Sequence, residues 1–335
     1  MRRIITTVFA TVLLAGVVAC GDDGPTTVRL VTYDSFPTKD TPLNDALAEF
    51  TRDTGIGVEI VVAGDAGTMV TKAALTSGNP EGDVMWGVDN TLLSAATDAD
   101  VFDGTPAEVD HGDVCVNYDR AWFAERGIDP PVTLDDLVEP QFRDLLVVQD
   151  ATASSPGLAF LLATIARYGE DGWQQYWRDL VANGVEVADS WSTAYYERFS
   201  GAAGSEGDRP LVVSYGTSPP AEVVFSDPPI DPATGDAPTG VSEGTCFRQV
   251  EYAGVLRGTD HADAAERLLE FLTGERFQRE LPLTLFVYPA NDAAELPAVF
   301  TRFAVSPAEP FTLDPAAIEA NRTTWQEQWS AIAVG

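Results

Sequence analysis

Hydrophobic and polar positions follow two alternating patterns along most of the chain. Short runs rich in β-branched residues, such as 28–34, 58–62 and 83–87, are typical of buried strands. The stretches between them carry apolar residues at helical spacing. In 41–55 this pattern begins at Thr-Pro and ends at a glycine, as helices commonly do. The order strand, helix, strand, helix predicts a parallel α/β sheet with functional residues at the carboxyl ends of its strands.

A second unit of the same kind follows the segment 114–123. Its expected elements are a strand at 145–150, helices at 151–169 and 171–184, a strand at 185–189, a short helix from Ser192 and a strand at 211–215. Beyond a strand at 247–255, helices are expected at 260–280, broken near Gly274, and at 312–333, where a tryptophan stripe is expected to pack. Two α/β units in one chain predict two lobes with a cleft between them.

The first residues have the layout of a secretory signal, with two arginines followed by an apolar run from Ile4 to about Val18. This run is short for a membrane span, which needs ~20 residues. Its end, Val-Val-Ala before Cys20, resembles a bacterial lipobox. The resemblance implies a signal peptide at 1–19, a lipid on Cys20 and a tether at 20–27. An ordinary cleaved signal with an incidental cysteine is the alternative.

The formal net charge of −32 excludes some classes of partner. Nucleic acids require lysine and arginine to contact their phosphates, and anionic lipid surfaces require the same cations. A surface that keeps the protein soluble accounts for most of the charge. A second consequence is that cationic ligands are enriched near the protein.

The residue patterns of common enzyme sites are missing. The chain has two histidines, His111 and His261, and neither has a cysteine or histidine at metal-ligand spacing, so no metal site is expected. There is no G-x-S-x-G, no S-x-x-K, no P-loop and no G-x-G-x-x-G after a strand. We therefore expect a protein that is not an enzyme and that uses no cofactor.

Aromatic residues beside polar ones stand at the ends of several predicted strands. They are Tyr33, Trp191 and Tyr215, with Phe286 and Tyr288 in a later segment. Each alone is more often a core residue than a site residue. Taken together on both units, they predict a cleft that sandwiches a flat ligand. Ring stacking and cation–π attraction favour an aromatic cation by ~0.5 to 2 kcal/mol per contact.

In order along the chain, several motifs resemble those of the substrate-binding proteins of thiamine ABC transporters, within the two-lobed periplasmic binding protein superfamily. The matching stretches are "TYDSF", "GVDNTLL", "SSPGLAFLL", "WSTAYY", "LVVSYGTSP", "SEG" followed by "QVEYA", "FVYPAN" and "RTTWQEQWSAI". The resemblance implies an α/β fold with lobes at 28–113 with 247–287 and at 114–246 with 288–335. It also implies a monomeric receptor that captures thiamine, or its phosphate esters, and delivers it to a membrane permease. Such a receptor works in the periplasm or on the outer face of the cytoplasmic membrane.

The same resemblance assigns roles to residues at the matching positions. Tyr33, Trp191 and Tyr215 are implied to contact the ligand, and the carboxylate of Asp65 is implied to pair with its amine or its cationic ring. Ser154 and Gly157 stand at an expected helix start, where backbone amides and hydroxyls suit a hydroxyl or phosphate tail. Thiamine joins an aminopyrimidine to a cationic thiazolium, so each of these contacts is chemically reasonable.

The sequence departs from the family pattern at several aromatic positions, and the tryptophan sometimes found soon after "YDSF" has no counterpart in 37–42. Ala221 stands where a tyrosine is expected, and Phe286 where a tryptophan is expected. A related pyrimidine or another small cation therefore remains an alternative ligand. A ferric-ion binding protein of the same fold is a further alternative, because Tyr195 and Tyr196 are adjacent. A secreted hydrolase and a purely structural lipoprotein are less well supported.

The two remaining cysteines, Cys115 and Cys246, lie where the chain is expected to pass between the lobes. In two-lobed binding proteins the crossing strands run side by side, and the exterior of the membrane permits oxidation. We expect a disulfide that ties these strands, with Cα atoms ~4.4 to 6.8 Å apart. Two buried free thiols are the alternative.

Overall fold

The computed structural model describes residues 26–335. The predicted signal peptide, Cys20 and most of the predicted tether lie outside the described residues. Within the described range, no helix is both long and apolar enough to cross a membrane.

The strands of the described chain form one mixed sheet. They are β1 (Thr27–Thr32), β2 (Gly57–Val62), β3 (Val84–Asp89), β4 (Ala107–Asp119), β5 (Leu146–Gln149), β6 (Glu186–Ala188), β7 (Leu211–Tyr215), β8 (Thr239–Val255) and β9 (Tyr288–Pro289). Their order is β2-β1-β3-β8-β4-β7-β5-β6, and β9 pairs with β4. β1 is parallel to β2 and β3, and β5 is parallel to β6 and β7. The long strands β4 and β8 pair antiparallel with each other, and β8 with β3 and β4 with β7 join the two parallel groups.

The longer helices lie close to where the apolar spacing predicts them. The helices are α1 (Pro42–Thr54), α2 (Ala66–Leu75), α3 (Leu93–Asp98), α4 (Arg120–Arg126), α5 (Ser155–Ala182), α6 (Pro219–Val224), α7 (Ala262–Thr273), α8 (Glu275–Gln278), α9 (Leu281–Thr284), α10 (Ala298–Phe303) and α11 (Pro315–Ala333). The short helices α4, α6, α9 and α10 were not predicted. Single turns of 3₁₀-helix stand at Asp136–Val138 and Pro140–Phe142, and a π-helical segment at Thr193–Arg198.

Local sequence signals account for the helix ends. Asn44 accepts hydrogen bonds from the backbone and hydroxyl of Thr41 at the start of α1, and Gly55 ends this helix in the left-handed conformation with φ 74°. The two helices expected at 151–169 and 171–184 are continuous as α5, with a break in helical geometry at Gly169, where φ is 68°. The sequence therefore predicts the position of the break correctly, although no loop separates the two parts.

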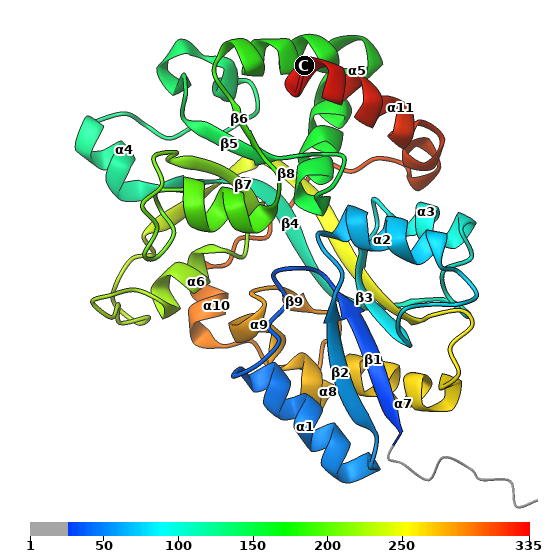
Figure 1. Ribbon diagram of the computed structural model, residues 1–335. Coiled ribbons are helices and arrows are strands. Elements are labelled where there is room, and N and C mark those ends of the chain that lie inside the picture. The colour runs from blue at the N-terminus through cyan, green and yellow to red at the C-terminus, as the bar shows by residue number, and fades with distance from the viewer. Residues whose placement is uncertain (1–25) are drawn as a thin grey trace, which may run out of the picture.

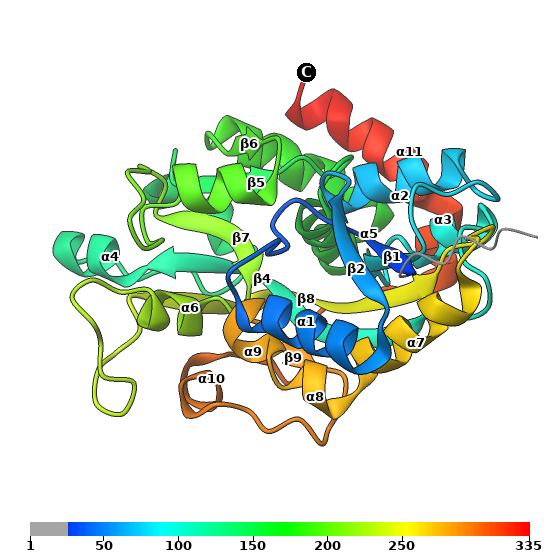
Figure 2. The ribbon, with the colours of Figure 1, turned by 60° about the horizontal axis from the view of Figure 1, so that its bottom comes forward.

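The parallel groups form two halves of the molecule, and β4 and β8 run between them (Figure 1). In one half, the residues of α1, α7 and α8 share an apolar core with β1 and β3. In the other half, α5 covers the sheet, and α11 packs on α5 (Figures 1 and 2). The tryptophan stripe of the last helix packs as predicted, because Trp329 is fully buried with its ring 5.5 Å from that of Trp177. The exact lobe boundaries stay a prediction.

Cys115 on β4 and Cys246 on β8 lie side by side where these strands cross between the halves. Their sulfur atoms are bonded, and their Cα atoms are 4.1 Å apart, slightly closer than the expected range. Both side chains are buried. In the β4–β7 pairing, Cys115 is also opposite Ser214, so this crossing point borders the strand end that carries Tyr215.

Candidate functional site

A cavity of about 390 Å³ is lined by segments from both halves of the molecule. One half contributes the segment after β1, the start of α2 and the segment after α9. The other contributes the start of α5, the π-helical segment and the β7–α6 connection, and a residue of β8 forms part of the floor. This volume lies within the ~300 to 1,000 Å³ typical of small-molecule sites. Tyr33, Asp65, Trp191, Tyr215 and Phe286 all line this cavity, as the sequence predicts a shared cleft.

Tyr33 follows β1, and its ring lies against the backbone of Gly87 on β3. A Cβ atom at position 87 would overlap this ring, and the φ of 112° at Gly87 is one that other residues rarely adopt. On another side, the Tyr33 ring meets Phe36 edge to face at 5.8 Å between centroids. The position of Tyr33 in the cavity thus depends on a glycine in the neighbouring strand.

Trp191 is held on two sides within the second half. Its ring stacks on Tyr195 with centroids 4.8 Å apart and an angle of 16° between the planes. Its indole N–H donates to the hydroxyl of Ser214 at 3.1 Å. A ring fixed in this way loses little conformational entropy when a ligand packs against it.

Two phenylalanines from opposite halves meet at the edge of the cavity. Phe286 follows α9, Phe225 follows α6, and their ring centroids are 5.7 Å apart. Phe225 stands one helical turn after Ala221, the position at which the family pattern has a tyrosine. Ala221 and Phe225 both line the cavity, and because residues four apart on a helix share a face, Phe225 brings an aromatic ring to the side on which Ala221 lies.

The cavity is acidic. Four carboxyl groups line it, and none of the described residues around it is lysine, arginine or histidine; the acidic residues are Asp34, Asp65, Glu222 and Glu251. Burial raises the pKa of Asp65 to about 6, although the Ala66 amide donates to this carboxyl group. Oδ2 of Asp65 is buried without a hydrogen-bond partner. A ligand cation would relieve the cost of burying these charges.

Ser154 and Gly157 do not line the cavity, whereas Ser155 and Pro156 between them do. A Cβ atom at position 157 would lie 2.7 Å from the backbone oxygen of Gln149, so glycine here permits α5 to pack against the end of β5. Ser154 is 2% exposed and precedes the first turn of α5. The start of α5 thus faces the cavity as predicted, but through the neighbours of the two predicted residues. Ligand contact by Ser154 and Gly157 stays a prediction.

Several lining residues are not among the predicted site residues, namely Asp34, Ser155, Tyr195, Ser218, Glu222 and Glu251. Asp34 and Ser155 are direct neighbours of predicted residues, and they lie within the motifs "TYDSF" and "SSPGLAFLL". Glu251 lies in the middle of β8, within the stretch "QVEYA" that resembles the family, but the resemblance gives its carboxylate no role. Glu222 binds the Tyr195 hydroxyl at 2.7 Å and the Ala203 amide at 2.6 Å, which gives it a structural role.

The two adjacent tyrosines that suggest iron binding lie in different environments. Tyr195 is buried and its hydroxyl donates to Glu222, whereas Tyr196 is 56% exposed. Among residues 26–335, no group of three or more His, Cys, Asp or Glu side chains is placed to hold a metal ion.

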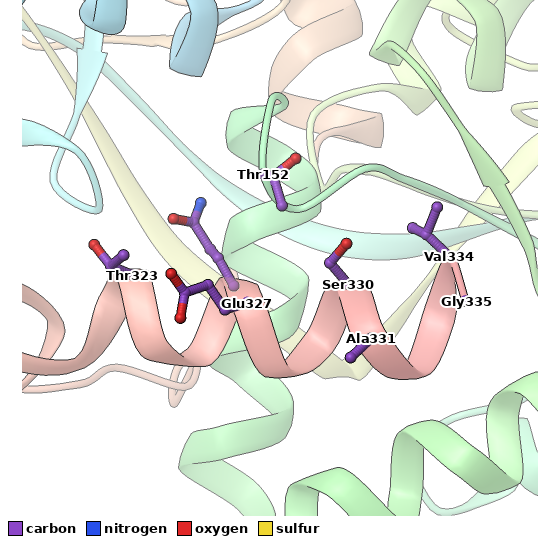
Figure 3. Close-up of a pocket in the computed structure, with 8 residues that line it drawn as sticks. Thr152, Thr323, Glu327, Ser330, Ala331, Val334 and Gly335 are labelled. Carbon is purple, nitrogen blue, oxygen red and sulfur yellow. The ribbon is translucent and has the colours of Figure 1, made fainter.

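A second, open depression runs along α11 opposite Thr152 (Figure 3). Thr323, Glu327 and Ser330 lie on the helix at this depression, and Val334 stands near its end. It is lined mainly by one helix face and carries none of the predicted site residues.

Comparisons with known proteins agree with this architecture. The model of the family described as "Bacterial extracellular solute-binding protein" matches residues 34–279. The thiamine-binding periplasmic protein of Salmonella typhimurium is 31% identical over 90% of this chain and 92% of its own length. That of Escherichia coli is 29% identical over the same shares. A solved structure titled "Periplasmic thiamin binding protein" has a TM-score of 0.81 and 26% identity, covering 93% of this chain and 98% of its own.

These matches confirm the predicted two-lobed periplasmic binding protein fold. Members of the family capture solutes outside the cytoplasm for ABC import and do not catalyse reactions. The protein is accordingly an extracytoplasmic binding protein and not an enzyme, and its chain belongs to the bacterial extracellular solute-binding protein family.

Proposed function

We propose that this protein captures thiamine in the cavity between its halves and delivers it to the permease of an ABC importer. The observation that carries the proposal is the composition of the cavity, which combines aromatic rings from both halves with several carboxyl groups and no basic side chain among the described lining residues. The thiamine-binding relatives support the same ligand. Thiamine carries a permanent positive charge on one flat ring and an amine on the other.

In this proposal the rigid ring of Trp191 stacks on one ring of thiamine, and Tyr215 and Tyr33 contact it from other sides. Asp65 pairs with the cationic or amine-bearing part. The Ser155 hydroxyl and the backbone amides at the start of α5 bind the hydroxyethyl tail, or its phosphate ester where one is present. We further propose that the protein is attached to the membrane through a lipid on Cys20 and that it acts as a monomer.

Calorimetric titration tests the ligand. The protein is first unfolded in guanidinium and refolded, so that ligand acquired during expression is removed. Thiamine, thiamine monophosphate, spermidine and ferric citrate are then titrated separately. We expect one thiamine per chain, with affinity unchanged by chelator, and tryptophan fluorescence quenched on binding. Visible absorption on addition of iron, with no heat from thiamine, would instead support a ferric-ion binding protein.

A further inference from the structure

Three carboxyl groups lie side by side on adjacent strands beneath the cavity. In the β3–β8 pairing Asp89 is opposite Glu251, and in the β4–β8 pairing Asp110 is opposite the same Glu251. Residues directly opposite on paired strands project from the same face of the sheet. This carboxyl row of Asp89, Glu251 and Asp110 therefore brings three acidic groups together in a buried place, where three negative charges would repel one another strongly.

The outer members of the carboxyl row, Asp89 and Asp110, form hydrogen bonds with other residues of the protein. Asp89 accepts from the hydroxyl and amide of Thr91 through one oxygen, and from the side chain of Gln249 at 2.6 Å through the other. Asp110 accepts from the indole N–H of Trp86 at 3.2 Å. These hydrogen bonds hold both side chains in place, and neither Asp89 nor Asp110 lines the cavity.

Glu251 is the member that differs. It lines the cavity, is 9% exposed, and its Oε2 is buried without a hydrogen-bond partner. A buried polar atom left unpaired costs free energy, unless a ligand supplies the partner. A residue that lines the cavity and has an unpaired carboxyl oxygen therefore indicates a ligand contact.

The surroundings of Glu251 favour its protonated form. Burial, and next the negative charges of Asp110 and Asp89, raise the pKa of Glu251 well above its usual range. Burial also raises the pKa of Asp110 to about 7. The titratable groups facing Glu251 are acidic or phenolic, namely Asp110, Asp89, Asp65, Tyr33 and Tyr215. Burial and mutual repulsion therefore favour a proton shared by the Asp110–Glu251 pair.

We propose that Glu251 determines specificity by binding the ligand in its neutral form, with its O–H donating to a ring nitrogen and its carbonyl oxygen accepting from an adjacent amine. A carboxylic acid presents a donor beside an acceptor, and the amine-bearing edge of an aminopyrimidine presents the complementary pair. The contact separates two tasks, because Asp65 attracts the positive charge while Glu251 distinguishes an aminopyrimidine from other flat cations. The inference rests on the proposed function, since it assigns a residue to one half of thiamine.

The test compares wild type with Glu251→Gln and Glu251→Leu between pH 7 and pH 9. The glutamine side chain keeps a donor beside an acceptor but cannot ionise, whereas leucine keeps neither. Glu243→Gln makes the same change at an exposed position of the same strand and is the matched control. The two probes are thiamine and its aminopyrimidine half, 4-amino-5-hydroxymethyl-2-methylpyrimidine. Dissociation constants are measured by calorimetry, and folding by circular dichroism and thermal unfolding.

We expect wild-type affinity for both probes to fall as pH rises above neutrality, because the proton on the pair is lost. Glu251→Gln should bind within about threefold of wild type at pH 7 and show no such fall, whereas Glu251→Leu should bind about tenfold or more weakly. Relief of charge repulsion should leave both variants at least as stable as wild type at pH 8, so lost affinity is not a folding defect.

Three results would overturn the proposal. Glu251→Leu with wild-type affinity would remove Glu251 from the site while leaving thiamine binding intact. The second result is a tenfold loss of affinity in Glu251→Gln together with a wild-type affinity that rises with pH. It would mean that the ionised carboxylate binds the ligand. Wild type that binds neither probe would end both proposals. Wild type that binds the aminopyrimidine but not thiamine would end the proposed function alone, and the variants would then be judged on the aminopyrimidine.

Discussion

The backbone N–H of Gly67 donates to the carbonyl oxygen of Ala153, with 2.9 Å between the two atoms. Gly67 is in the first turn of α2, in one half of the molecule, and Ala153 stands just before α5, in the other half. Their neighbours Asp65 and Ser155 both line the cavity. This hydrogen bond therefore closes one side of the cavity by joining the starts of two helices.

Replacement of Gly67 should weaken ligand binding. A Cβ atom at position 67 would lie 2.6 Å from the Ala153 oxygen, so Gly67→Val should hold the two helix starts apart. We expect thiamine affinity to fall about tenfold or more, which corresponds to loss of one or two buried contacts. Small-angle scattering at saturating ligand should give a larger radius of gyration than for wild type. Leu75→Ala, at an 83% exposed position of the same helix, should leave both quantities unchanged.

Removal of the Trp191 ring should cost more affinity than any change confined to the edge of the cavity. Trp191→Ala deletes the ring that stacks on Tyr195 and that we propose to stack on the ligand. We expect a loss of about 2 to 4 kcal/mol in binding free energy, and a smaller loss for Trp191→Phe, which keeps a ring but not the hydrogen bond to Ser214. The quenching of fluorescence by thiamine should disappear in both variants. Trp122→Ala on α4 is the control, and wild-type affinity in Trp191→Ala would exclude this stacking role.

The parallel strand groups and the helix ends could be predicted because their causes are local. Thr41 with Pro42 begins α1, and Gly55 ends it, through interactions within a few residues. The aromatic residues at strand ends could be grouped for a related reason, since the strands within each parallel group deliver their carboxyl ends to one edge, and the two groups run in opposite directions, so these edges face each other. The predicted residues Tyr33 and Tyr215 accordingly line one cavity.

The residues that escaped prediction depend on contacts between distant segments. Glu251 is unremarkable in the sequence, and its environment arises only from the pairing of β8 with β3 and β4. The same holds for Phe225, because its contact with Phe286 joins the two halves of the molecule. At the start of α5, prediction selected Ser154 and Gly157 because a motif marks the turn but not which of its side chains points inward.

Ionisation of Asp65 should make the free protein less stable and the complex tighter. Its pKa in the folded protein is about 6, against ~3.9 in unfolded chains. A raised carboxyl pKa means that the folded state binds more protons, so stability is lost as pH rises from ~4 through about 6. Asp65→Asn cannot ionise and still caps α2. Relative to wild type, its free energy of unfolding should therefore rise by about 2 to 3 kcal/mol over that interval.

The same substitution should act oppositely on the ligand. Asp65→Asn should weaken the binding of thiamine more at pH 8, where wild-type Asp65 is ionised, than at pH 5. Urea unfolding and calorimetry at both pH values measure the two effects, with Asp53→Asn at an exposed position of α1 as the control. If the difference in stability between Asp65→Asn and wild type does not change with pH, Asp65 is not the buried acid described here.

The Cys115–Cys246 bond should stabilise the fold more than it affects the site. It closes a loop with a sequence separation of 131 residues, and native bonds over long loops typically contribute about 2 to 4 kcal/mol. We expect no free thiol in a denatured chain that begins after Cys20, and a lower unfolding temperature with reductant. Affinity for thiamine should change little. The disulfide joins β4 to β8, and the hydrogen bond from Trp191 to Ser214 on β7 does not include either cysteine. The double variant Cys115→Ser/Cys246→Ser should unfold at the temperature of reduced wild type and be insensitive to reductant. Two thiols titrating in the denatured chain without reductant would instead show that both cysteines are free.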